Sequence, residues 1–78
     1  MINENEIDRT VRRAIERYFR DLDGEKACGI YDMVIASVER PLIESVLHHS
    51  AGNQTRAAEL LGMNRNTLRK KIRAYRIK

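Results

Sequence analysis

The segment from residue 30 to residue 49 is apolar on more than one side of the helix that its spacing predicts. Such a helix must be buried against more than one neighbour, because water would otherwise contact part of its apolar surface. The chain has only 78 residues. A helical hairpin within one chain cannot enclose this segment, whereas four helices from two chains can. The sequence therefore predicts a homodimer.

Pro41 lies in the middle of this segment, where it lacks an N–H group and its ring clashes with the carbonyl of Ser37. It either occupies the first position of a second helix or bends one continuous helix. The apolar residues Val34, Val38 and Leu42 keep a spacing of four residues across the proline. This constant phase favours one kinked helix.

A second apolar stripe has the spacing of one helix face from Glu6 to Leu22. One proline, four glycines and the absence of alternating apolar residues give no signal for strands, so we predict an all-α fold. Residues 1–5 are expected to be a frayed polar end. We interpret residues 1–78 as a single domain in which 6–49 dimerise. The predicted dimer contacts are Ile7, Val11, Ile15, Tyr18, Val34, Val38, Leu42 and Val46.

The composition argues against several kinds of site. The one cysteine, Cys28, cannot form an intrachain disulfide, and a buried thiol is expected rather than a nucleophile because no histidine lies beside it. His48 and His49 would point about 100° apart on a helix and cannot clamp one metal ion. No apolar run reaches ~18 residues and no signal segment is found, which predicts a cytoplasmic protein without membrane contact. No enzyme motif is found, and no cofactor or metal is expected.

The charge is divided unevenly along the chain. Residues 1–49 contain seven Lys or Arg and ten Asp or Glu, whereas residues 50–78 contain eight Lys or Arg and the single acid Glu59. The net formal charges of the two parts are therefore −3 and +7. A basic C-terminal third predicts a polyanionic partner such as nucleic acid, with a merely solvated basic face as the alternative.

Two short helices are predicted in this basic third, at 54–61 and from 65 to 74 or 75. Asn53 and Asn64 are suited to cap the N-termini of these helices, because an asparagine side chain can accept a backbone N–H bond there. Gly62 is suited to the tight turn between them. The spacing therefore predicts two helices joined by a short turn.

Small side chains at Ala57 and Ala58 would let another helix cross closely. Together with the turn, they predict a helix-turn-helix within residues 50–78. Its second helix would point Leu68 and Ile72 inward and polar or basic residues outward, as a recognition helix does. The candidates for contacts with bases or phosphates on this helix are Asn64, Arg65, Asn66, Thr67, Arg69, Lys70, Lys71 and Arg73.

The stretch "GNQTRAAELLGMNRNTLRKKI" resembles the C-terminal helix-turn-helix of the Fis proteins (factor for inversion stimulation), which are bacterial nucleoid-associated DNA-binding homodimers. The stretches "YFRDLDG" and "YDMVIASVERPLIESVL" are similar to the same family, so the resemblance covers about residues 7–76. The same pattern occurs at the C-terminus of enhancer-binding activators. A free-standing Fis-like protein is favoured, and a detached activator domain or a basic helical protein-interaction module are the alternatives.

The resemblance implies that the first two helices of two chains intertwine and that the dimer binds and bends double-stranded DNA. It implies a nucleoid-associated transcriptional regulator with weak sequence preference. The mobile arm by which Fis proteins contact a recombinase has no counterpart before the first helix, so a recombinase contact is not implied. Arg65 and Asn64 match the positions nearest the bases. Contacts with the DNA backbone or groove edge are implied for Asn53, Gln54, Thr55, Thr67, Arg69, Lys70 and Lys71.

Overall fold

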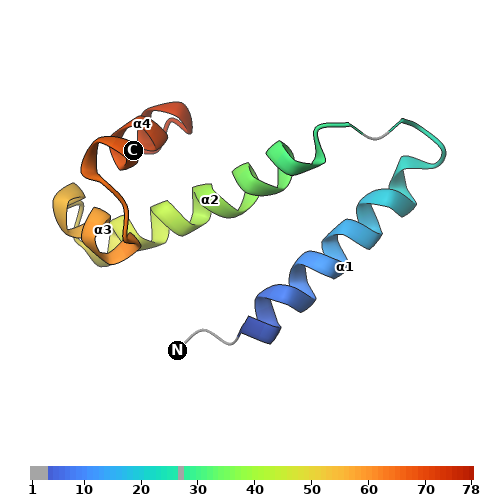
Figure 1. Cartoon of the computed structure of the whole chain (residues 1–78), viewed down its shortest axis with the longest axis horizontal. Coiled ribbons are helices and arrows are strands. Elements are labelled where there is room, and N and C mark those ends of the chain that lie inside the picture. Colours follow the sequence, from blue (N-terminus) through green and yellow to red (C-terminus); the bar gives the residue numbers. More distant parts are fainter. Residues whose placement is uncertain (1–3, 27) are drawn as a thin grey trace.

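The computed structural model describes residues 4–26 and 28–78. This part of the chain contains four α-helices and no strand, which confirms the predicted all-α class. Figure 1 shows α1 and α2 as two long arms joined by a loop, with α3 and α4 folded together at the C-terminal end of α2. The helices are α1 (Glu4–Leu22), α2 (Ile30–His49), α3 (Gln54–Leu61) and α4 (Arg65–Ala74).

The helix bounds differ from the predicted ones mainly at α1, which begins at Glu4 rather than at Glu6. Asn5, expected in a frayed end, is therefore helical. The first three residues of that expected end lie outside the described residues. α2 continues through Pro41 as one helix, which confirms that the proline does not start a new one.

The core lies where α2 meets the two short helices. Ile43 of α2, Ala57 and Ala58 of α3, and Leu68 of α4 are buried and form one cluster. Partly buried apolar side chains surround it. Val46, which was predicted to contact a second chain, is one of these and packs against the core of its own chain. The surrounding side chains are Val46, Leu47, Leu61, Met63, Ile72, Tyr75 and Ile77.

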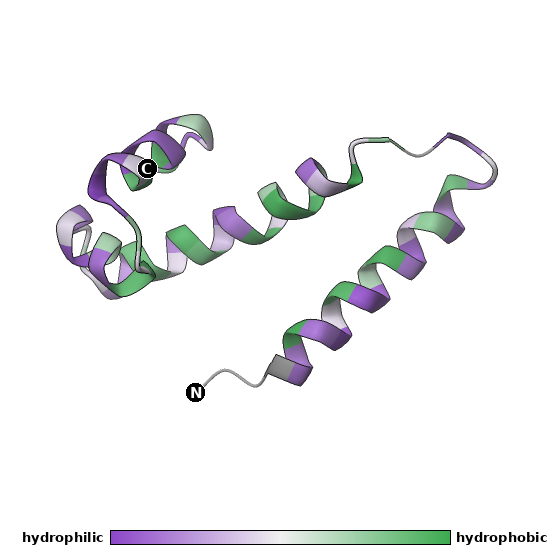
Figure 2. Ribbon diagram, in the orientation of Figure 1, coloured by the Kyte–Doolittle hydropathy of each residue, from purple (hydrophilic) through white to green (hydrophobic). Residues whose placement is uncertain are grey.

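The two arms, in contrast, leave large apolar side chains in contact with water. Ile7 and Phe19 of α1 are 50% and 53% exposed, and Val38 and Leu42 of α2 are each 45% exposed. Figure 2 shows hydrophobic positions alternating with hydrophilic ones along both arms. An apolar groove runs between the arms. It is lined by Thr10, Val11, Ala14, Ile15, Met33, Val34, Ser37 and Val38.

The prediction that Cys28 is buried is wrong, because the thiol is exposed in the loop between α1 and α2. Figure 1 shows this loop at the end of the molecule farthest from α3 and α4. The core cluster lies at the opposite end of α2, so it cannot cover the cysteine.

The chain enters the left-handed backbone region just after α3 and again just after α4. Gly62 follows α3 with φ 76°, where the absence of a Cβ makes this conformation easy. After α4 the corresponding residue is Arg76, with φ 54°. The Ile77 N–H donates to the carbonyl of Ile72 at 2.9 Å and closes this turn. A residue with a Cβ costs roughly 1–2 kcal/mol in this region.

We expect Arg76→Gly to raise the free energy of unfolding by about 0.5–1 kcal/mol. The relief of backbone strain is partly offset by the greater freedom of glycine in the unfolded chain. Urea unfolding at one fixed chain concentration measures this difference. Ala74→Gly, at the last residue of α4, is the control and should lower stability. A less stable Arg76→Gly variant would contradict the strain argument.

Candidate nucleic-acid interface

Asn53 caps the N-terminus of α3, as the sequence predicts. Its Oδ1 accepts a hydrogen bond from the backbone N–H of Arg56 at 3.1 Å, and its extended backbone turns the chain into the helix. Asn53, Gln54 and Thr55 are all exposed. The start of α3 therefore presents three of the predicted DNA-contacting side chains to solvent at one place.

The close approach of α3 to α2 and α4 depends on Ala57 and Ala58. Both are buried in the cluster with Ile43 and Leu68. The Met63 N–H donates to the carbonyl of Ala58 at 3.0 Å and holds the turn that leads to α4. This arrangement confirms the predicted helix-turn-helix. A longer side chain at either alanine would force the helices apart, because the core leaves no space for added methylenes.

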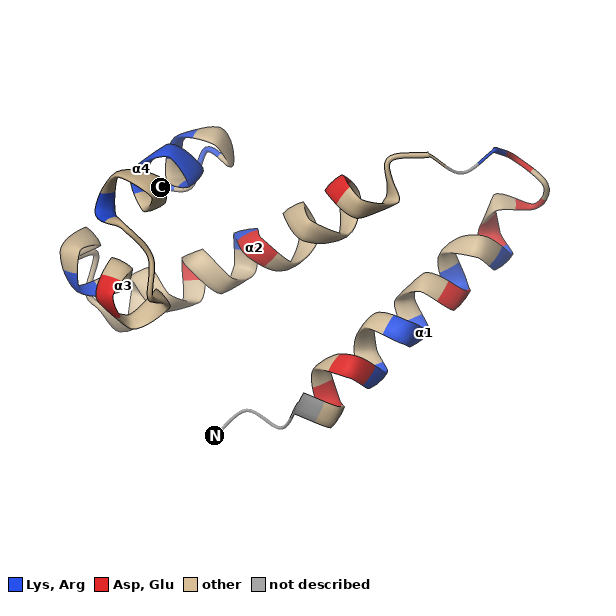
Figure 3. Cartoon of the chain, viewed as in Figure 1, with Lys and Arg blue, Asp and Glu red and all other residues tan. Residues whose placement is uncertain are grey.

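α4 has one apolar side and one polar, cationic side. Its N-cap, Asn64, accepts a hydrogen bond from the backbone N–H of Asn66 at 2.7 Å. Leu68 is fully buried and Ile72 is half-buried, as the sequence predicts. Figure 3 shows basic residues along this helix. The exposed residues of α4 and its cap that were predicted to contact DNA are Asn64, Arg65, Asn66, Thr67, Arg69, Lys70 and Arg73.

Arg65 and Thr55 join the starts of the two helices. Nη1 of Arg65 donates to Oγ1 of Thr55 at 3.4 Å. The bond is long and lies between exposed side chains, so it is weak and leaves most guanidinium donors for another acceptor. The start of α3 and the outward side of α4 thus form one surface, which we call the basic face. It consists of Asn53, Gln54, Thr55, Asn64, Arg65, Asn66, Thr67, Arg69, Lys70 and Arg73.

Lys71 is the exception among the predicted DNA-contacting residues, because its side chain turns toward α2. Its Nζ lies 2.8 Å from Oε2 of Glu39, and the hydroxyl of Tyr75 donates to Oε1 of the same carboxylate. The hydrogen bonds from Lys71 and Tyr75 lower the pKa of Glu39, and the bond to Glu39 raises the pKa of Tyr75. The structure therefore places Lys71 apart from the basic face.

Sequence reasoning missed Glu39 altogether. Its partners lie 32 and 36 residues further along the chain, so no local spacing marks the contact. In the sequence Glu39 is one acid among several on a helix. Only the packing of α4 on α2 shows that this carboxylate meets the recognition helix.

The positive charge of the basic face is not neutralised within the described chain. Glu59 is the only acid among residues 50–78, and it pairs with Arg56 at 3.4 Å. Both side chains are more than half exposed, so this pair is weak. None of the ion pairs between described residues involves Arg69, Lys70 or Arg73. The face can therefore attract a polyanion.

The described part of the chain offers few other kinds of site. Among residues 4–26 and 28–78, no three His, Cys, Asp or Glu side chains are grouped so that they could hold a metal ion. In the same ranges, every helix is too short or too polar to cross a membrane. Within the described part of the chain, the basic face is therefore the surface whose side chains point most clearly to one kind of ligand, a polyanion.

Comparison with known proteins points to one family. Residues 34–75 match the family described as "Bacterial regulatory protein, Fis family". A protein of Ralstonia nicotianae named "Putative Fis-like DNA-binding protein" is 47% identical over 74 residues, which are 95% of this chain and 96% of that protein. Proteins of the same name from Neisseria meningitidis serogroups A and B are each 49% identical over 67 residues, which are 86% of this chain and 85% of those proteins. The similarity therefore extends beyond the helix-turn-helix into the arms.

Proposed function

The chain belongs to the Fis family of bacterial regulatory proteins, and from this premise we propose that it is a homodimer that binds and bends double-stranded DNA. It acts as a nucleoid-associated transcriptional regulator in the cytoplasm. The basic face on a helix-turn-helix is the observation that supports this proposal most directly. The names of the similar proteins, which describe Fis-like DNA-binding proteins, support it as well.

The start of α4 is the part that enters the DNA. The major groove is about 12 Å wide and admits one α-helix, whose first residues reach the base edges. Arg65 stands at that position, and its guanidinium can donate two hydrogen bonds to the O6 and N7 atoms of a guanine. The Oδ1 atom of Asn64 is engaged in the cap, which leaves its amide NH₂ group to donate to a base.

The rest of the basic face grips the DNA backbone. Thr55 and its neighbours at the start of α3 combine exposed polar side chains with the positive end of a helix dipole, and both features suit a phosphate. The exposed cations of α4 neutralise further phosphates, which gives affinity without base preference. The proposed backbone contacts are Asn53, Gln54, Thr55, Thr67, Arg69, Lys70 and Arg73.

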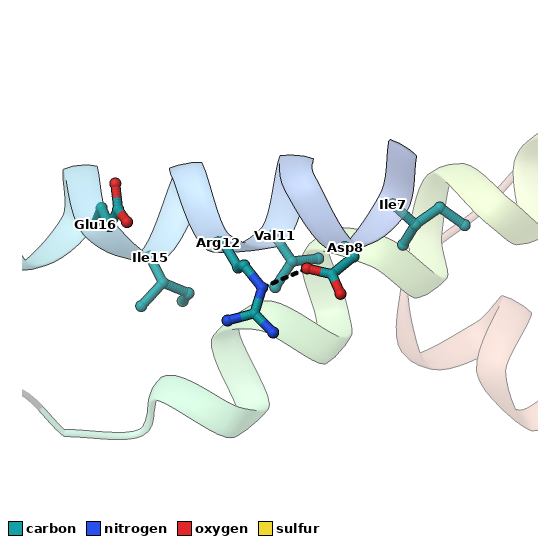
Figure 4. A pocket seen from close by; sticks show the side chains of 6 residues that line it. All are labelled: Ile7, Asp8, Val11, Arg12, Ile15 and Glu16. Atoms are coloured by element: carbon teal, nitrogen blue, oxygen red, sulfur yellow. Dashed lines mark hydrogen bonds and ion pairs between the residues drawn. The ribbon is translucent and has the colours of Figure 1, made fainter. Parts of the chain in front are cut away.

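A second copy of the chain covers the apolar groove between the arms. Figure 4 shows Ile7, Val11 and Ile15 in one row along α1, beside the ion pair of Asp8 and Arg12. This row and the exposed side of α2 are too apolar for a surface in water. A small domain without a disulfide also needs to bury such apolar side chains to be stable. The proposed interface residues are Ile7, Val11, Ile15, Tyr18, Val34, Val38, Leu42 and Val46. Of these, Val46 lies at the edge of the core of its own chain.

The bending of DNA follows from the spacing of the two basic faces. In the family the two recognition helices are closer than one turn of straight duplex, which is about 34 Å. The duplex must then bend and narrow its minor groove between the half-sites. Sequences that deform easily at their centre bind more tightly, so DNA shape contributes to specificity in addition to base contacts.

Duplex binding and bending measured together test the proposed function. We expect log K for a duplex with an A·T-rich centre and G·C flanks to fall linearly with log salt concentration, because bound phosphates release counterions. In a circular-permutation assay, the mobility of the complex should depend on the position of the site. Binding that does not respond to salt, or mobility that does not respond to position, would contradict the proposal.

Val38→Asp should disrupt the dimer. The substitution places an unpaired carboxylate against the apolar arms of the second copy, which costs roughly several kcal/mol. Sedimentation equilibrium in the micromolar range should then show single chains. Arg40→Gln is the control, because it changes the net charge by the same amount at an exposed position of α2. A Val38→Asp variant that sediments as an intact dimer would place the interface elsewhere.

Arg65→Ala should remove most of the base readout. We expect the difference in affinity between a duplex with flanking guanines and a scrambled duplex to shrink by about 1–3 kcal/mol at one fixed salt concentration. Arg73→Ala is the matched control and should weaken binding to both duplexes alike. If Arg65→Ala also weakens both duplexes alike, Arg65 contacts the backbone and reads no base.

A further inference from the structure

Glu39 connects the long helix α2 with the recognition helix α4. Each oxygen of its carboxylate has its own partner, because Lys71 Nζ is 2.8 Å from Oε2 and the Tyr75 hydroxyl donates to Oε1. Among the described residues, these two hydrogen bonds join a side chain of α2 to side chains of the helix-turn-helix region. Glu39 and Lys71 are also withdrawn from solvent, with side chains 23% and 32% exposed.

The geometry of this contact restrains rotation of α4. Lys71 and Tyr75 are four residues apart and therefore lie on the same side of the helix, one turn from each other. Because one carboxylate binds both side chains, it holds the helix at two points along its axis. The buried cluster that includes Ile43 and Leu68 holds α4 near α2, but apolar contacts are not directional. Rotation of α4 would break both polar bonds at once.

The same contact separates two neighbouring lysines. Lys70 is exposed on the basic face, whereas Lys71 is turned about 100° away toward Glu39. A phosphate would have to compete with the carboxylate for the ammonium of Lys71. Because the pair is partly shielded from water, salt screens it less than it would screen an exposed pair.

We propose that Glu39 is a positioning residue, which sets the orientation of α4 on α2 and keeps the ammonium of Lys71 out of the phosphate contacts. This inference rests on the proposed function, since it concerns how the basic face meets DNA. It reverses the role that the sequence predicted for Lys71. Glu39 itself touches no DNA and acts through its two partners.

The salt dependence of duplex binding tests the inference with three matched variants. Each lysine that contacts a phosphate contributes about 0.9 to the slope of log K against log salt, and therefore about 1.8 in a dimer. Lys70→Gln should reduce the slope by about this amount, whereas Lys71→Gln should leave it unchanged. Glu39→Gln should make the slope steeper by up to about 1.8, because it frees Lys71 to contact a phosphate. A residue that only stabilised the fold would not steepen it.

The reverse pattern would overturn the inference. This means that Lys71→Gln reduces the slope as much as Lys70→Gln does, and that Glu39→Gln leaves it unchanged. Hydrogen exchange of the free protein gives a second readout that needs no DNA. Glu39→Gln and Lys71→Gln should speed amide exchange in α4 but not in α1, and Lys70→Gln should do neither. Equal exchange in all three variants would show that Glu39 does not hold α4, even if duplex binding itself proved absent.

Discussion

The packing of Ile43 against Ala57, Ala58 and Leu68 is the contact on which the rest of the structure depends. These are the only buried apolar side chains among the described residues, and they come from three different helices. The two alanines allow the helices to approach closely, so that a very small core fixes α3 and α4 on the end of α2. The position of the basic face on the molecule therefore depends on this contact.

The arms have no comparable core of their own, and this shapes the proposed assembly. No residue of α1 and none in the first half of α2 is buried among the described residues. In the proposed dimer a second copy covers these apolar side chains, so folding of the arms and dimerisation would be one event. Glu39 lies on α2 between this open surface and the core, where its contacts with Lys71 and Tyr75 can couple the orientation of α4 to the proposed dimer.

Local chemistry made the helix-turn-helix predictable from the sequence. Asn53 and Asn64 supply their own caps, and Gly62 supplies a left-handed turn, so the bounds of α3 and α4 follow from neighbouring residues. Long-range packing made other features unpredictable. The partners of Glu39 are more than 30 residues away, and Val46 has the same spacing as the arm residues although it packs on the core of its own chain. Periodicity identifies an apolar side of a helix but does not identify what covers it.

The central claim is that two chains share their arms and present two basic faces to one duplex. Native mass spectrometry of the wild-type protein, alone and with a short duplex, measures this stoichiometry directly. The account predicts two chains in the free protein and two chains on each duplex, with no folded single chain at micromolar concentration. A folded single chain in solution, or a complex of one chain with one duplex, would contradict it.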